Sequence, residues 1–313
     1  QSTLLHKQAD NVWRIDFQLG WDADPKEEKK IENIRPRVEA MLGKEQKWEL
    51  EWASVYTFRC RKMDSYIHNR VIFMGDAAHQ VSPFGARGAN GALQGVENLC
   101  WKLAALLDGR APTSLLSTYD TERQHGAREN ILHSTRATDF MTPKNSMTCV
   151  FRDAVLGLAR DYPFARSLVN SGRLSVPCTY EETPLNTLDS DHFADRMRPG
   201  SACADAPVRS NKCDEWLLER LGNSFTVLFY GELAASAQQP LNDAVMNLAR
   251  EGHRIGTLRV RPRGEEARNE HEVVDCEGVL AQRYDLLPGT VYLIRPYQHV
   301  SARWRTLTPD AVV

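Results

Sequence analysis

The stretch RVIFMGDAAHQVSPFGARGANGALQGVENLCWKLAALL, residues 71–107, decides the fold. It begins as an apolar strand, breaks at Gly75 and Asp76, crosses a loop of small residues and continues with the spacing of an amphipathic helix. Strand-to-helix connections usually take about two to six residues, so a longer one this rich in glycine indicates that its backbone comes close to something bulky. A bound ligand is the first candidate.

The residues on either side of this loop suggest what the ligand needs. We expect residues 71–74 to form a short buried strand with Asp76 at its carboxyl end, where open α/β sheets place ligand contacts. The helix after the loop should present free N–H groups and the positive end of its dipole near Ala89, Asn90 and Gly91. Such a helix end favours a polarised oxygen or a delocalised negative charge. The apolar side of the helix is expected to hold Leu93, Val96, Leu99, Leu103 and Leu106.

Composition limits the classes of partner. The 313 residues contain 39 Lys and Arg against 41 Asp and Glu, which gives no general electrostatic reason to expect nucleic acid or a membrane surface. No apolar run is long enough to cross a bilayer, and the first residues lack the pattern of a signal peptide. The seven cysteines are scattered and never form CxxC, which favours a reducing cytoplasm.

Patterning along the rest of the chain predicts several elements and two domain boundaries. Residues 12–19 and 49–63 are typical of strands, the latter with Tyr56 and Phe58 on one face, and residues 113–141 of a long, largely solvent-exposed helix. A turn-rich, Pro-containing span follows, and from residue 225 strands and a helix alternate as in a small α/β domain. The predicted domains are residues 1–70 with substrate-domain strands and a helix, 71–197 with the glycine-rich motif and helices, and 198–313.

The segment GDAAHQVSPFGARGANGALQGVENLCWKLA resembles the second flavin-binding motif of the FAD-dependent aromatic hydroxylases, the class A flavoprotein monooxygenases related to phenol hydroxylase. By composition alone, a glycine-rich surface loop that binds nothing is an equal alternative. The resemblance extends to residues 48–70, similar to substrate-domain strands, and to the C-terminal part, similar to the thioredoxin-like domain of larger members. It implies an α/β fold in which part of an FAD and substrate region precedes a thioredoxin-like domain.

The resemblance also implies roles for individual residues. Asp76 would bond the ribityl chain of FAD, and the backbone at Gly88, Ala89 and Asn90 would meet the pyrimidine edge of the flavin. Pro83 would border the substrate above the ring, and Gly85 belongs to the same cofactor loop. Tyr56 and Phe58 are candidates to line an aromatic-substrate pocket, although packing under a helix is equally compatible with their pattern. His79 is expected to be structural, and no catalytic residue is assigned.

The sequence departs from the family in three places. Gly95 stands where an acidic residue is usual, and Arg87 replaces what is more often Gln or a small residue. No GxGxxG follows a strand near the N-terminus, so the dinucleotide half of the FAD site is missing from the pattern. We therefore expect the C-terminal portion of a longer enzyme that, intact, uses NAD(P)H and O2 to hydroxylate a phenolic substrate. The N-terminal FAD-binding segment would be a partner, and the portion alone is expected to be inactive.

Two other classes of function stay open. One is a non-catalytic interaction module with a vestigial flavin loop and a C-terminal domain that builds a homodimer. The other is a thiol oxidoreductase, which the absence of CxxC disfavours. No HExxH, His/Cys cluster or EF-hand spacing indicates a metal site, so none is expected.

Overall fold

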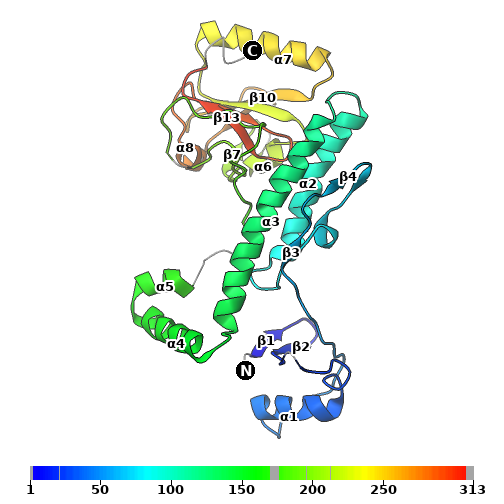
Figure 1. Cartoon of the computed structure of the whole chain (residues 1–313). Helices are drawn as coiled ribbons and strands as arrows, with labels where there is room; N and C mark the ends of the chain where they lie inside the picture. Colours follow the sequence, from blue (N-terminus) through cyan, green and yellow to red (C-terminus); the bar gives the residue numbers. More distant parts are fainter. Residues whose placement is uncertain (1–2, 21, 170–175, 195, 212, 308–313) are drawn as a thin grey trace. The chain divides into compact units, whose positions relative to one another are not determined.

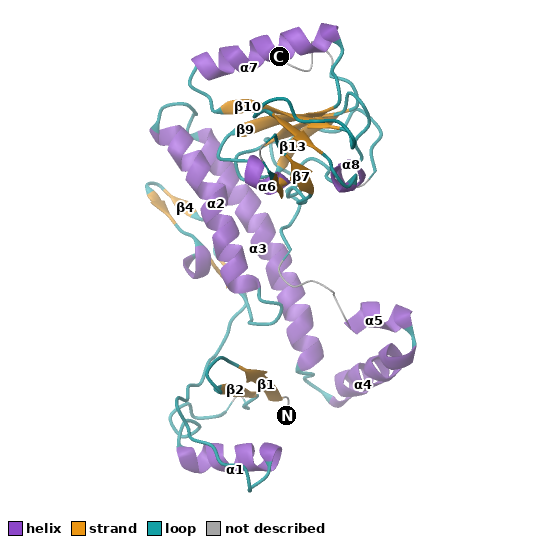
Figure 2. Ribbon diagram, turned by 180° about the vertical axis from the view of Figure 1, so that it is seen from behind, coloured by secondary structure: helices purple, strands orange, loops and turns teal. Residues whose placement is uncertain are grey.

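A computed structural model describes residues 3–20, 22–169, 176–194, 196–211 and 213–307 (Figures 1 and 2). The chain divides into two compact units. The first combines Gln1–Cys60, Ser82–Phe84 and Ser134–Gly172; the second combines Arg61–Val81, Gly85–His133 and Arg173–Val313. Among the described residues, every helix is too short or too polar to cross a bilayer.

The first unit contains a hairpin and several helices. The predicted strand at 12–19 is confirmed as β2, which pairs antiparallel with β1, and the charged segment after it contains helix α1. Helix α4 begins with a reciprocal capping box between Asn145 and Thr148. The bounds are Thr3–Lys7 for β1, Trp13–Phe17 for β2, Ile31–Leu42 for α1, Ser146–Asp161 for α4 and Pro163–Val169 for α5.

The strand predicted over residues 49–63 is wrong for most of its length. Residues 47–60 have no regular secondary structure, and only β3, Arg61–Lys62, is a strand, paired with β6, His79–Gln80. The β-forming side chains do not supply a packed face: Trp52 is 78% exposed and Tyr56 is 68% exposed. Strand propensity largely measures packing against neighbouring strands, and these residues lack it.

The start of the glycine-rich motif also differs from the prediction. Only Val71–Ile72 form a strand, β5, which pairs antiparallel with β4, Ile67–His68, and Val71 is 56% exposed. Asp76 lies on a short 3-10 helix, η1, Gly75–Ala77. The apolar run at 71–74 is therefore the arm of a small hairpin rather than a buried strand of an open parallel sheet.

Helix α2, Arg87–Leu107, confirms the helix predicted after the loop, and α3, Ser114–Met141, confirms the long helix beyond it. Within the second unit, α2 lies antiparallel beside the first part of α3, as both ribbon views show (Figures 1 and 2). The predicted apolar face of α2 is confirmed in part. Leu99 is 7% exposed and Leu103 packs against the same core cluster, but Leu93 is 63% exposed. The other buried positions of α2 are small or polar: Arg87, Gly91, Gly95, Asn98, Lys102 and Ala105. The exposure expected of α3 is wrong at Glu122 and Arg123, which are each 1% exposed.

The C-terminal part of the second unit contains a seven-stranded mixed sheet in the order β13-β12-β9-β10-β11-β7-β8. Strands β9, β10 and β11 are parallel, and β12 and β13 run antiparallel to their neighbours. The unit β9–α7–β10 with the pair β12–β13 has the arrangement expected of a thioredoxin-like core. The strands are Pro207–Arg209, Asp214–Trp216, Phe225–Tyr230, Ile255–Arg261, Glu272–Val274, Val291–Ile294 and Val300–Trp304, from β7 to β13.

Both faces of this sheet are covered. On one face, α7, Ala235–Arg250, packs Ala237 and Leu241 against Val227 and Phe229 of β9. On the other, α6, Leu217–Arg220, and α8, Val279–Tyr284, pack against Leu228 and the remaining core (Figure 1). Successive residues of β9 point to opposite faces, so burial on both sides explains its continuous apolar run. The α/β fold class is confirmed. The domain limits at residues 70 and 197 stay a prediction.

Candidate functional site

The start of α2 is an uncapped helix N-terminus. Ala86, the residue before the helix, has φ 52 and ψ 41 in the left-handed region, and its side chain cannot accept a hydrogen bond. The first N–H groups of an α-helix have no partner within the helix. No acidic residue stands in the first turn. The backbone N–H groups of Gly88, Ala89 and Asn90 lie in this first turn and can meet an acceptor from outside the helix, with the positive end of the dipole behind them.

Asp76 is held close to this helix end by the short helix η1. Gly75 has φ +56, and a Cβ built on it would lie 3.4 Å from the Cβ of Ala92 in α2. The glycine thus permits both the left-handed backbone and the close packing of η1 on α2. The side chain of Asp76 is exposed, so its carboxylate can accept hydrogen bonds from ligand hydroxyl groups.

The remaining candidates for cofactor binding are Gly85, Gly88, Ala89 and Asn90, in the loop and the first turn of α2. Gly85 has φ +86, in the left-handed region. At Gly88, an added Cβ would lie 3.8 Å from its nearest neighbour, Cγ2 of Val81, which is an ordinary contact. The protein itself therefore leaves room for a side chain at Gly88. Ala89 and Asn90 are exposed. The side-chain nitrogen Nδ2 of Asn90 donates a hydrogen bond to the backbone carbonyl of Ala86 at 2.7 Å, which fastens the loop to the first turn of the helix.

Buried side chains of α3 hold the first two turns of α2 in place. Arg123 donates from Nη2 to the carbonyl of Gly91 at 2.9 Å and from Nη1 to the hydroxyl of Tyr180 at 2.6 Å. Arg87 is 4% exposed and donates from Nη1 to Oδ1 of Asn130 at 3.2 Å. Arg87 thus adds a fixed positive charge at the helix end. The sequence pattern gave no signal for these contacts, because the charges of α3 suggested solvent exposure.

His79 lies beneath the same helix end. It is 5% exposed, and its ring carbon Cε1 would lie 3.5 Å from a Cβ added to Gly91. Burial, assisted by Arg123, lowers the pKa of His79 to about 4. The imidazole is therefore neutral at pH 7, which agrees with the structural role expected for it.

Farther along α2 lies a second group of contacts, a buried ion cluster. Nζ of Lys102 and Nη1 of Arg295 each lie 2.7 Å from an oxygen of Glu122. Burial acts to raise the pKa of Glu122, but the two cations prevail and lower it to about 2. The cluster ties α2 and α3 to the loop between β12 and β13. Further hydrogen bonds to Glu122 come from Asn98, Thr183 and Tyr297.

The substrate candidates Tyr56, Phe58 and Pro83 belong to the first unit. The rings of Tyr56 and Phe58 have centroids 6.0 Å apart, and Phe58 meets Phe84 edge-on at 6.1 Å. The predicted proximity of Tyr56 and Phe58 is thus present, although on an irregular segment. Pro83 is exposed and belongs by sequence to the loop that enters α2. Their role toward a substrate stays a prediction.

The cysteines of the thioredoxin-like part do not form a reactive pair. Cys203 is buried, and burial raises the pKa of its thiol to about 12. Cys213 is exposed and Cys276 is partly buried, and both are free thiols. Thiol exchange needs a thiolate of low pKa, so these positions lack the environment that such chemistry requires.

The first two turns of α2 have features that a flavin ring would require. The uncapped N–H groups, the missing first-turn acid and the charge of Arg87 all favour an electron-rich edge with polarised oxygens. Small residues let a planar group approach the backbone, and exposed Asp76 can hold a polyhydroxyl chain. These are the properties expected of the half of an FAD site that holds the ring and the ribityl chain.

Comparison with known proteins agrees with this description. Residues 4–134 match a family model described as an FAD binding domain. The chain is 28% identical over 221 residues to a 3-(3-hydroxy-phenyl)propionate/3-hydroxycinnamic acid hydroxylase of Mycolicibacterium gilvum, which covers 70% of this chain and 38% of the relative. A 4-methyl-5-nitrocatechol 5-monooxygenase of a Burkholderia species is 28% identical over 263 residues, covering 79% and 42%. The chain thus spans less than half the length of both curated relatives.

Solved structures share the fold. The flavin-dependent monooxygenase PieE, in complex with FAD and substrate, superposes with a TM-score of 0.75 at 20% identity, covering 96% of this chain and 56% of that one. BexE, from BE-7585A biosynthesis, gives a TM-score of 0.68 at 22% identity, covering 99% and 58%. The family resemblance predicted from the motif is confirmed: the chain carries a match to an FAD binding domain, its relatives are named as aromatic hydroxylases and monooxygenases, and its fold is that of flavin monooxygenases.

Proposed function

We propose that this chain forms the flavin-ring half of the FAD site in a monooxygenase that hydroxylates a phenolic or other aromatic substrate with NAD(P)H and O2. The uncapped N-terminus of α2 beside Asp76 carries the proposal, because its free N–H groups and positive charge match what a reduced flavin needs. The relatives' names support the aromatic substrate class.

The overall reaction balances with one reductant. NAD(P)H, a proton, O2 and an aromatic C–H give NAD(P)+, an aromatic C–O–H and water, so one oxygen atom enters the ring and the other leaves as water. Bound FAD would supply the electron transfer and the activation of O2. The chain's own residues bind and orient: Asp76 accepts hydrogen bonds, and the N–H groups of Gly88, Ala89 and Asn90 stabilise negative charge.

Two further groups of residues would position the cofactor and the substrate. Arg123 and Arg87 fix the first turns of α2 against α3, so the N–H groups keep their direction without reorganisation during the reaction. Tyr56, Phe58 and Pro83 are proposed to contact the aromatic substrate, for which their rings and apolar surface are suited. The absence of GxGxxG from the sequence leads us to expect that this chain by itself binds FAD weakly.

The test measures substrate-dependent turnover in the native protein, by which we mean this chain together with the N-terminal FAD-binding segment expected from the sequence. The protein is first loaded with FAD. We expect slow NAD(P)H oxidation alone, faster oxidation with a substituted phenol, and a product that carries one oxygen-18 atom from labelled O2. FAD that is bound without stimulated oxidation or labelled product by any phenol in a panel would exclude hydroxylation. Absence of FAD binding in the native protein would instead favour the non-catalytic, dimer-forming module.

A further inference from the structure

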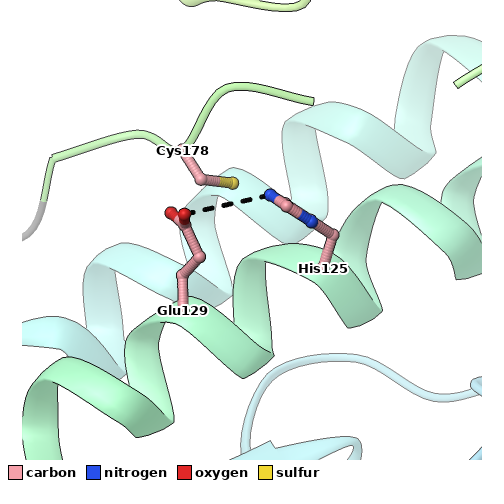
Figure 3. A group of neighbouring side chains, drawn as sticks. All are labelled: His125, Glu129 and Cys178. Carbon is pink, nitrogen blue, oxygen red and sulfur yellow. Dashed lines mark ion pairs between the residues drawn. The ribbon is translucent and has the colours of Figure 1, made fainter. Parts of the chain in front are cut away.

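A histidine, a glutamate and a cysteine meet on the surface of α3. His125 and Glu129 are four residues apart on one face of the helix, with Nε2 of His125 4.0 Å from Oε1 of Glu129. Cys178 reaches the same place from the segment that leads to Tyr180. The three potential ligand atoms all lie within 4.8 Å of one another. Figure 3 shows the sulfur of Cys178 over the helix, between the imidazole and the carboxylate.

Gly126 makes this meeting possible. A Cβ built on Gly126 would lie 3.2 Å from Sγ of Cys178 and also 3.2 Å from Nη1 of Arg123, closer than such atoms normally approach. Glycine within a helix is less favourable than alanine by about 1 kcal/mol, so its position here needs a local reason. The missing side chain leaves the space that the sulfur occupies against the helix between His125 and Glu129.

We propose that His125, Glu129 and Cys178 bind a borderline-soft divalent cation of the Zn2+ class. An imidazole nitrogen, a carboxylate oxygen and a thiolate sulfur are the three ligand types that zinc takes in proteins, and the thiolate disfavours Mg2+ and Ca2+. Zinc bonds of about 2.0–2.3 Å place tetrahedral ligands between about 3 and 4 Å apart, so small side-chain rotations close the site.

The surroundings are compatible with such a site. The side chain of His125 is 28% exposed and that of Glu129 is 46% exposed, which gives the cation an entry path and leaves a fourth position for water. Burial raises the pKa of the Cys178 thiol to about 11, and Arg123 only partly opposes this. The thiol is therefore protonated without a cation, and binding converts it to a thiolate and releases its proton to solvent. The bound cation would join α3 to the segment before Tyr180. This proposal departs from the absence of a metal expected from the sequence, because the fold alone brings Cys178 to the helix.

Cobalt titration of the chelator-treated chain tests the proposal. We expect one equivalent of Co2+ to bind with a sulfur-to-cobalt charge-transfer band, and Zn2+ to displace it. Cys178→Ser should abolish the band, while Cys100→Ser, at an exposed cysteine of α2, should retain it. Gly126→Ala favours the helix but displaces the sulfur, and should weaken cobalt binding about tenfold or more.

Any of three results would overturn the site. One is the lack of stoichiometric cobalt binding by the wild-type chain. Another is a charge-transfer band that persists in Cys178→Ser, which would place the cation at another cysteine. Circular dichroism spectra that match the wild type show that the variants are folded. Wild-type affinity in Gly126→Ala would contradict the close approach of sulfur and helix on which the proposal rests.

Discussion

Lys102 of α2 and Glu122 of α3 form a fully buried ion pair, with Nζ 2.7 Å from Oε2 and neither side chain exposed. Arg295, from the loop between β12 and β13, shares the same carboxylate. A buried charge is tolerated only when it is paired and hydrogen-bonded, and Glu122 meets both conditions through its two cations and its polar neighbours. The pair therefore joins α2 to α3, and Arg295 links both helices to the thioredoxin-like part of the same unit.

Replacing Glu122 with Gln should destabilise the protein strongly. The variant leaves Lys102 and Arg295 buried without a counter-charge, a situation that typically lowers the free energy of unfolding by about 3–5 kcal/mol. Urea denaturation followed by circular dichroism measures the loss. Glu27→Gln breaks the exposed pair with Lys30 and should change stability by about 1 kcal/mol or less. Equal effects of the two variants would show that the buried cluster is not stabilising.

The stability of the folded protein should fall with acid at a pH above that at which ordinary carboxylates protonate, because of His79. Burial lowers the pKa of His79 from 6.5 to about 4, so the unfolded chain binds more protons than the folded chain between these values. Stability is therefore fully present above pH 6.5 and falls as the pH drops toward 4. Burial shifts the pKa of His299 in the same direction. Unfolding midpoints measured from pH 7.5 to 5 should decline less steeply in His79→Phe than in the wild type; an unchanged slope would argue against a buried neutral imidazole.

Gly200→Ala should be among the most damaging single substitutions. Gly200 has φ +89, and an added Cβ would lie 2.2 Å from the carbonyl oxygen of Tyr180, so the backbone must move. We expect a loss of about 3 kcal/mol or more. Gly278→Ala is the matched control, since Gly278 has φ +76 but nothing within 4 Å of its Cβ position. It should lose only about 1 kcal/mol, the conformational part of the effect. Similar losses at both sites would refute the steric reason.

Asp76→Ala should lower FAD affinity without affecting the fold. The side chain is exposed, and its proposed task is to accept hydrogen bonds from the ribityl hydroxyls, so its removal should weaken binding by about 1–3 kcal/mol. Flavin fluorescence titration of the native protein measures this. Asp108→Ala, at the opposite end of α2, is the control and should bind FAD like the wild type. An unchanged dissociation constant in Asp76→Ala would remove this residue from the site.

The sequence was informative where pattern and chemistry act locally. The order of residues from Gly75 to Lys102 predicted the loop, the helix and the flavin family, and the alternation of strands and a helix from residue 225 predicted a small α/β domain. It misled where burial depends on distant partners. Leu93 and Trp52 are apolar but exposed. Glu122 and Arg123 are charged but buried, because partners on other segments satisfy them: Lys102 pairs with Glu122, and Arg123 donates hydrogen bonds to Gly91 and Tyr180. The periodicity of apolar residues describes a single segment of the chain, whereas these contacts join residues from several segments.

Whether the backbone around Gly88 meets the flavin ring, as we propose, can be measured as the FAD affinity of Gly88→Val in the native protein. Inside the protein the new Cβ would have only an ordinary contact, 3.8 Å from Cγ2 of Val81, so a lost affinity would report on the cofactor rather than on folding. The control is Gly256→Val in β10, where nothing lies within 4 Å of the Cβ position. We expect the dissociation constant for FAD to rise about tenfold or more in Gly88→Val, equivalent to about 1.4 kcal/mol, and to stay unchanged in the control. Equal affinity of Gly88→Val, Gly256→Val and the wild type would contradict the proposal.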